Sequence, residues 1–460
     1  MMVRPAAPPA TQRLGWVDMT LVLIFLIGIY LGVNLPITSS IPFPSAPAGI
    51  AGIVLLWRRR DAIETRHLAV FLGVLVVYIA SVLAATDYAF LGKRFTGLVQ
   101  LVYSLIIGYA LFLTVLQAER RQIARLFFWM SVIILIGCIL ETHAGLAAVS
   151  DRVRAAIYDH GVYISDRRDL LLYGKVRPKF FTSEPSAVTF GYTLFVFCWF
   201  LVSGYRWKLF LYVALIGAGM IVMPGPTLLL SLLLIAPYYY FIIPASQPGN
   251  RRNTMYRAGI LIFGSLLLIV FAIVGSVAYS ERLNQILHGG GDPSFFYRVI
   301  GPMLVALEIF KVYPVAGAGL TGEPFIHELA TNTYARSSFY STDWGFSKLS
   351  EVLTNYFWLH WIYLGAIFGL AVLAAITYWM HVLRVPSITF CWIVWIIFGQ
   401  ASGAYVGPKT WTVLLLPAAL SVLYCRNAAR VVVPLPEAQR RIQSIRLGNR
   451  LRQPGLVSQR

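Results

Sequence analysis

The chain contains a series of apolar runs, each bounded by charged residues, glycine or proline. Because a helix needs about 20 apolar residues to cross the hydrocarbon core of a bilayer, each run is a candidate span. Twelve candidates lie at about 16–35, 41–57, 68–86, 97–117, 124–141, 186–204, 207–222, 226–244, 258–279, 354–380, 387–404 and 408–425. We therefore expect an all-α fold, in which residues 1–460 form a single polytopic transmembrane helical bundle.

The composition supports this fold class. Hydrophobic residues make up 58% of the 460 residues, and charged residues only 12%. A water-soluble domain usually carries about 25% charged residues. The chain thus has too few polar side chains to cover a soluble fold, which excludes the soluble classes of protein. Between the seventh and eighth runs, Pro224 and Pro226 indicate either a turn between two spans or a re-entrant break.

Lys and Arg are unevenly distributed along the chain. Cytoplasmic loops of membrane proteins are enriched in both residues. With the N-terminus in the cytoplasm, 23 of the 38 basic residues but only five of the 19 acidic residues fall on the cytoplasmic side. We therefore expect both termini in the cytoplasm, and residues 426–460 as a basic tail that is solvated or binds anionic lipid heads. The net charge of +19 is then a topology signal, so nucleic acid is not an expected partner.

Two long loops on the outer face, at 142–185 and 280–353, are the places where polar chemistry is expected. Loops beyond about 15 residues are usually functional or disordered, and the aromatic residues of these two favour order. The spans carry few ionisable groups; Asp18 and His360 lie near the ends of two of them. Transporters and pumps usually carry such groups within their spans, so this scarcity argues against the alternative of a polysaccharide exporter or flippase.

The sequence predicts neither a cofactor nor a metal. It has no phosphate-binding loop of the G-x-x-x-x-G-K-[ST] type, no Cys-x-x-Cys and no Asp-x-Asp pair in the outer loops. ATP and nucleotide sugars are confined to the cytoplasm, so a substrate used at the outer face must carry its own leaving group. A polyprenyl-diphosphate-linked sugar does so.

The first long loop ends in "RPKFFTSEPSAVTFG", residues 177–191. Thr182 or Ser183 fits a helix cap, and Pro185 fits a first helical turn. Arg177 and Lys179 either anchor the following span at the headgroups or bind an anion, and Glu184 either complements the helix dipole or acts as a base.

The second long loop contains "GGGDPSFFYRVIGPMLVALEIFKVYPVAGAGLTGEPF", residues 289–325. Asp292 fits an N-cap with Pro293 in the first helical position, and Pro302 predicts a kink in the helix that carries Arg298. Gly317, Gly319 and Gly322 form either a structural turn or a nest of backbone N–H groups for an anion.

The two loops together resemble the O-antigen polymerase and ligase superfamily of bacterial polysaccharide assembly. The resemblance rests on "RPKFFTSEPS", on "SFFYRVIGPMLVALEIFKVYPVAGAGLTG" and on the span "NYFWLHWIYLGAIFG", residues 355–369. The family often has a His-Asn pair before that span, whereas Thr354 precedes Asn355 here, and the Ser-Arg that the family often has near "MPGPT" is absent. These departures favour a polymerase of exopolysaccharide type over the ligase branch.

The resemblance implies a glycosyltransferase of the bacterial inner membrane that joins polyprenyl-diphosphate-linked repeat units at the periplasmic face. It also implies a flippase and a chain-length regulator as partners in the same pathway. The alternative within the superfamily is a ligase that moves a finished glycan from the carrier to another acceptor.

In such a transfer, negative charge develops on the departing diphosphate. Arginine stabilises this charge well because its planar guanidinium group stays charged and donates paired hydrogen bonds. Arg177 and Arg298 are the first candidates for this role, followed by Lys179, Arg336 and Lys348.

The candidates for the general base are Glu184 and His327; His288 and His360 are poorer choices. The aromatic side chains expected either to face sugar rings or to anchor the chain at the interface are Tyr334, Phe339, Tyr340, Trp344 and Phe346.

Overall fold

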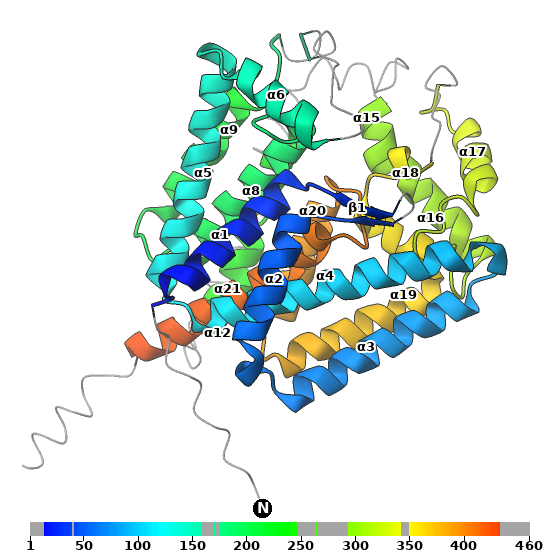
Figure 1. Ribbon diagram of the computed structural model, residues 1–460, viewed down its shortest axis with the longest axis horizontal. Helices are drawn as coiled ribbons and strands as arrows, with labels where there is room; N and C mark the ends of the chain where they lie inside the picture. The colour runs from blue at the N-terminus through cyan, green and yellow to red at the C-terminus, as the bar shows by residue number, and fades with distance from the viewer. Residues whose placement is uncertain are drawn as a thin grey trace, which may run out of the picture.

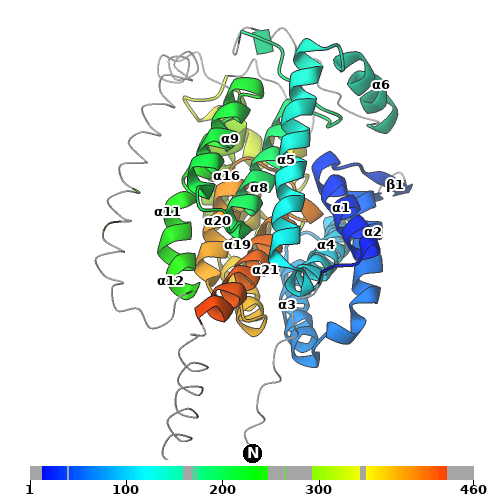
Figure 2. The same cartoon turned by 90° about the vertical axis from the view of Figure 1, so that its left-hand side faces the viewer.

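The computed structural model describes residues 13–38, 41–158, 169–170, 174–246, 259, 264, 293–341 and 349–432. Within these residues the regular secondary structure is helical apart from one short antiparallel hairpin, β1 (Leu35–Thr38) and β2 (Ile41–Phe43). Figures 1 and 2 show the helices gathered into one bundle, with the hairpin at its edge.

Seven helical segments in the described part of the chain are long and apolar enough to cross a membrane. They are α3 (Thr65–Ala84), Tyr88–Gln117 with α4 (Leu91–Gln117), α5 (Arg120–His143), α8 (Pro185–Val202), Pro226–Ser246, α19 (Tyr356–Val382) and Pro408–Arg426 within α21 (Pro408–Val432). Four shorter apolar helices are α1 (Trp16–Leu31), α2 (Ala46–Arg58), α9 (Lys208–Val222) and α20 (Ile388–Gly399).

These segments coincide with eleven of the twelve predicted runs, and the run at 258–279 lies outside the described residues apart from Gly259 and Gly264. A helical membrane protein is thus confirmed, while the number of crossings stays a prediction. The remaining described elements are η1 (Arg60–Ala62), η2 (Tyr88–Phe90), α6 (Ala147–Ile157), α10 (Pro226–Leu232), α11 (Ile235–Pro237), η3 (Tyr238–Ile242), α12 (Ile243–Ser246), α15 (Pro293–Phe295), η4 (Phe296–Ile300), α16 (Gly301–Val312), α17 (His327–Ala335) and α18 (Leu349–Val352).

Helix α8 forms the centre of the bundle. Every residue of α8 except Ser186 and Ala187 is buried, as expected for a helix that is apolar on all sides. It packs against α5, α9, α10 and α21. The turn at Pro224 and Pro226 separates α9 from α10, and Tyr212 Oη donates to the carbonyl oxygen of Ser231 at 2.9 Å, so the chain folds back on itself there. A break in the helix at these prolines is therefore confirmed, and whether it joins two spans or is re-entrant stays a prediction.

One end of the bundle, which we call the Arg-rich end, is marked by ion pairs and capping contacts between helices. Asp18 of α1 is held by Arg58 and Arg59 at the end of α2. Arg59 also donates to Gln117 at the end of α4. Arg120, which begins α5, donates to the last carbonyl oxygens of α8. Helix ends far apart in the sequence thus meet at this end.

The expectation that spans are almost free of ionisable groups was wrong in part. Besides Asp18 and His360, the apolar helices contain buried Arg94 and Glu141, and Lys409 lies at the start of α21. Each of the two buried groups bonds to backbone: Arg94 donates to the carbonyl oxygens of residues 85, 87 and 318, and Glu141 accepts from two amides. Such bonds offset the desolvation of a buried charge.

The start of α8 agrees with the sequence only in part. Pro185 occupies the first helical position as predicted, but the N-cap residue is Glu184. Thr182 does not cap the helix: its hydroxyl donates to the carbonyl oxygens of Lys179 and Glu184. The predicted cap at Thr182 or Ser183 was therefore wrong, because these residues belong to the turn before the helix.

The helix expected around Pro302 is interrupted one turn earlier. The chain runs from α15 through the π-helical turn η4 into α16, where Pro302 occupies one of the first positions. Because proline has no N–H to donate, the preceding turn widens to a π-helical pattern. The irregularity places Arg298 within this turn.

The glycine-rich segment after α16 is a structural turn. It forms backbone hydrogen bonds with α19 at a point where that helix is interrupted. At Gly365 the backbone of α19 is non-helical, with φ 66° and ψ −168°. The freed carbonyl oxygens of Ile362 and Tyr363 accept from the amides of Ala318 and Gly319, both at 2.9 Å. The amides of Gly317 and Gly322 also bond to backbone. The interpretation as an anion nest is therefore not supported, because these N–H groups are already used.

Candidate functional site

A cavity of about 340 Å³ lies where several helices begin, at the end of α8 away from the Arg-rich end. We call it the Glu184 cavity. It is lined by Glu184, Ser186, Ala187, Phe190, Pro293, Tyr297, Arg298, Glu351, Thr354, Ala401, Ser402, Gly403 and Lys409. These residues come from α8 and the residue before it, α15, η4, α18, the segment before α19, the segment between α20 and α21, and the first turn of α21; Figure 1 shows α15 and α18 at this end of the bundle.

Prolines begin three of the helices around the Glu184 cavity: Pro185 of α8, Pro293 of α15 and Pro408 of α21. Proline suits the first helical position because its φ is fixed near the helical value and the N–H it lacks has no partner there. The first turns of such helices carry partial positive charge and free N–H groups. The backbone around the cavity therefore favours an anion.

The Glu184 carboxylate lies at the N-terminus of α8 and is held in one orientation by a hydrogen bond. Ser186 Oγ donates to Glu184 Oε1, and the backbone of Glu184 is extended, with φ −151° and ψ 157°. Its side chain is partly buried and lines the cavity. A carboxylate held in this way is available to accept a proton from a group in the cavity.

Arg298 also lines the cavity, from the π-helical turn η4. Its backbone carbonyl oxygen accepts a hydrogen bond from Asn355 Nδ2 at 2.7 Å. Asn355 is fully buried and also caps α19, since its Oδ1 accepts from the amides of Phe357 and Trp358. Asn355 thus ties the turn that carries Arg298 to the start of α19.

Tyr297, beside Arg298, is kept neutral. Burial, together with the nearby Tyr340, raises the pKa of Tyr297 to about 12. The phenol therefore stays protonated at neutral pH and brings no charge to the cavity. Behind it, Phe296, Tyr334 and Tyr340 form an aromatic cluster with ring centroids 5.1 to 5.7 Å apart.

Lys409 was missed by the sequence analysis, which counted it within an apolar span. It occupies the first turn of α21 and lines the Glu184 cavity, with Nζ 5.2 Å from the centre of the Phe190 ring. Among the described residues no carboxylate forms a close salt bridge with it, but Glu184 of the same lining is near enough to interact electrostatically. A signal was present, because "GPKTW" places a cation directly after the proline that begins the last span.

Arg177 and Lys179 do not line the cavity. Arg177 forms an ion pair with Asp169, whose side chain is fully buried, with both Nε and Nη2 at 2.9 Å from Asp169 Oδ1. Lys179 is buried, and its backbone amide donates to Glu141 at 3.0 Å. Both residues lie in the turn that leads to α8, so the structure brings Glu184 and Arg298 together without them.

The segment before Glu184 is fixed by a buried arginine that the sequence analysis did not single out. Arg154 of α6 is fully buried and donates to the carbonyl oxygens of Thr182 and Ser183, at 2.6 and 2.9 Å. The two residues just before this pair, Phe180 and Phe181, have positive φ values of 26° and 64°. Such a conformation is costly without support, so Arg154 holds the turn that presents Glu184.

The other predicted residues lie away from the cavity lining or outside the described residues. His327 and Arg336 lie at the two ends of α17 and are exposed. Tyr334 is fully buried in the aromatic cluster, and the partly buried Tyr340 packs against it. Trp344, Phe346 and Lys348 lie outside the described residues. In the described part of the chain, no group of His, Cys, Asp and Glu could hold a metal ion.

Comparisons of the chain with protein-family models, with curated proteins and with solved structures find no match.

Proposed function

We propose that the protein is a membrane glycosyltransferase that joins polyprenyl-diphosphate-linked oligosaccharide repeat units into a polysaccharide. The observation that carries the proposal is the meeting of Glu184, Arg298 and Lys409 in one cavity at the beginnings of several helices. A carboxylate, two cations and helix N-termini are the groups needed to deprotonate a hydroxyl and receive a departing diphosphate. The resemblance of residues 177–186, 294–322 and 355–369 to the O-antigen polymerase and ligase superfamily supports the same class of function.

The diphosphate would bind between Arg298 and Lys409. The lining holds two cations and two carboxylates, Glu184 and Glu351, so the helix N-termini supply the additional positive potential. When the bond between the anomeric carbon and the diphosphate oxygen breaks, its electron pair moves onto that oxygen. The guanidinium of Arg298 donates paired hydrogen bonds to such an oxyanion, and Lys409 adds a point charge.

The acceptor sugar would bind on the Glu184 side. As its hydroxyl oxygen forms a bond with the anomeric carbon, Glu184 accepts the hydroxyl proton. The hydrogen bond from Ser186 fixes the direction of this carboxylate. No cofactor is needed, because the diphosphate is already a good leaving group.

The orientation of the chain completes the proposal. The Arg-rich end faces the cytoplasm of a bacterial inner membrane, and both termini lie there. The Glu184 cavity then faces the periplasm, where a flippase would deliver lipid-linked units and a chain-length regulator would act with this protein.

The proposal is tested in a deletion strain that carries Glu184→Gln or Arg298→Gln. We expect polymer to fall to about 1% or less, because a base and an oxyanion partner each contribute about 100-fold. Mass spectrometry of polyprenyl-linked glycans should show single repeat units accumulating. The matched control is Lys311→Gln, since Lys311 is exposed and, among the described residues, forms its ion pair with Glu308 on its own helix. Normal polymer from both site variants at normal membrane levels would refute the proposal.

The same experiment separates a polymerase from a ligase. Loss of a ligase would leave full-length polymer on the lipid carrier, whereas loss of a polymerase leaves single units. If full-length polymer accumulates on the lipid carrier, the Glu184 cavity would be the site of the ligase reaction, because a diphosphate leaves in both reactions.

A further inference from the structure

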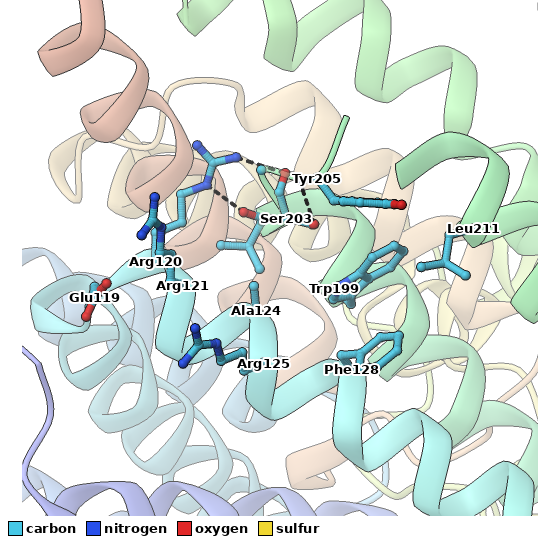
Figure 3. Close-up of a pocket in the computed structure, with 12 residues that line it drawn as sticks. Glu119, Arg120, Arg121, Ala124, Arg125, Phe128, Trp199, Ser203, Tyr205 and Leu211 are labelled. Atoms are coloured by element: carbon cyan, nitrogen blue, oxygen red, sulfur yellow. Dashed lines mark hydrogen bonds between the residues drawn. The ribbon is translucent and has the colours of Figure 1, made fainter. Parts of the chain in front are cut away.

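A second and larger cavity, of about 790 Å³, lies at the Arg-rich end of the bundle. We call it the Arg121 cavity. It is lined by Glu119, Arg120, Arg121, Ala124, Arg125, Phe128, Trp199, Val202, Ser203, Gly204, Tyr205 and Leu211. Figure 3 shows these side chains between the start of α5, the end of α8 and the start of α9. The transfer reaction proposed above uses none of them.

Arg120 has a structural role in this cavity. Its Nε donates to the carbonyl oxygen of Val202 at 2.6 Å and its Nη2 to that of Ser203 at 2.8 Å. These are the terminal carbonyl groups of α8, which have no partner inside the helix. The guanidinium also lies 4.4 Å from the centre of the Tyr424 ring. Arg120 therefore caps the C-terminus of α8 and is not available to a ligand.

Arg121 and Arg125 are available. Both are exposed, and within the described part of the chain neither has a hydrogen bond or an ion pair. They are four residues apart on α5, so their side chains project from one face of the helix. Glu119 is the only carboxylate of the lining. The cavity thus presents two guanidinium groups that form no ion pair with any described residue.

The lining becomes apolar along the same face of α5. Phe128 follows Arg121 by two turns, and its ring packs 5.8 Å from that of Trp199, with Leu211 beyond them (Figure 3). Tyr205 of the lining and Trp207, which begins the turn into α9, are 54% and 62% exposed. Exposed aromatic residues of this kind concentrate at the boundary between headgroups and hydrocarbon. Charge at the boundary and an apolar wall deeper in match the two parts of a phospholipid.

We propose that the Arg121 cavity binds an anionic glycerophospholipid. Its headgroup phosphate lies between Arg121 and Arg125, and one acyl chain lies along Phe128, Trp199 and Leu211. Charge complementarity selects the anionic headgroup, and basic pockets between transmembrane helices are suited to such lipids. A free phosphate would meet the same arginines but would leave the apolar wall uncovered.

The test is native mass spectrometry of the purified full-length protein with dioleoyl phosphatidylglycerol or dioleoyl phosphatidylcholine. We expect the wild type to retain phosphatidylglycerol at least tenfold better, because each basic residue near the headgroup contributes about fivefold. The double variant Arg121→Gln, Arg125→Gln should lose this preference. Ala124→Phe should lower retention without any change of charge, since Ala124 lies in the lining between the two arginines. An excess of inorganic phosphate should not displace the lipid.

A matched control removes two other exposed arginines, Arg60 and Arg206, which do not line the cavity. If this control variant lost the preference equally, the general charge of the protein would explain binding and the proposal would be wrong. Equal retention of both lipids by the wild type, or displacement by inorganic phosphate, would overturn it as well.

Discussion

The side-chain amide of Asn355 donates to the backbone carbonyl oxygen of Arg298 at 2.7 Å, across 57 residues of sequence. The same side chain caps α19, where Oδ1 accepts from the amides of Phe357 and Trp358. Asn355 therefore has two separable roles: it starts a helix, and it positions the turn that carries Arg298.

The two roles predict different results for Asn355→Ser and Asn355→Ala. Serine is a good N-cap but cannot reach the carbonyl oxygen of Arg298, so it should keep most of the stability and lose transfer about tenfold or more. Asn355→Ala should lower both stability and transfer, and the loss of the helix cap should account for about 1 kcal/mol of the lost stability. Thermal unfolding in detergent and the length distribution of the polymer measure the two effects. Full transfer by Asn355→Ser would show that Asn355 does not position Arg298.

Lys409 is expected to support transfer at the expense of stability. It is a partly buried cation that forms no close salt bridge among the described residues and has only an electrostatic interaction with Glu184, and an apolar replacement of a buried charge is often neutral or stabilising. Lys409→Met should therefore leave the melting temperature unchanged or raise it, and lower transfer about 100-fold. Lys409→Arg should recover part of the activity. A variant that melts normally and transfers normally would exclude Lys409 from the diphosphate site.

Local features of the fold could be read from the sequence, because they depend on neighbouring residues. Apolar runs predicted the apolar helices, and Pro185 and Pro293 predicted two helix starts. Glu184 and Arg298, chosen from separate loops, do line one cavity. Each was recognisable as a charged residue beside a helix start.

Features that depend on contacts between distant segments could not be read in this way. Arg154 lies in a segment that appears as an ordinary polar loop, and its bonds to Thr182 and Ser183 form only after α6 folds back onto the turn. The turn at Gly317 resembles an anion nest in sequence. The amides of Ala318 and Gly319 are already hydrogen-bonded to α19, because that helix breaks at Gly365. In the sequence, the same run predicts a continuous helix.

Arg177 is expected to act through its ion pair with Asp169. The Asp169 side chain is fully buried, so removal of the Arg177 guanidinium takes away the positive charge paired with a buried carboxylate and costs about 3–5 kcal/mol. Arg177→Met should therefore lower both the melting temperature and transfer, and the double variant Arg177→Met, Asp169→Leu should recover much of both. Recovery of stability without recovery of transfer would contradict this prediction and restore Arg177 as a ligand of the diphosphate.

Gly365 is expected to be essential for the break in α19 and for the turn at Gly317 that fills it. Its φ of 66° and ψ of −168° lie in a region that is nearly exclusive to glycine. A Cβ at this position would also lie 2.8 Å from the backbone nitrogen of Gly317, against the turn that fills the break in α19. Gly365→Ala should therefore destabilise the protein by at least about 1–3 kcal/mol. Gly73→Ala is the matched control: a Cβ there meets nothing within 4 Å, and alanine stabilises a helix interior by up to about 1 kcal/mol. Thermal unfolding in detergent compares the two, and equal melting temperatures would show that α19 does not depend on this break.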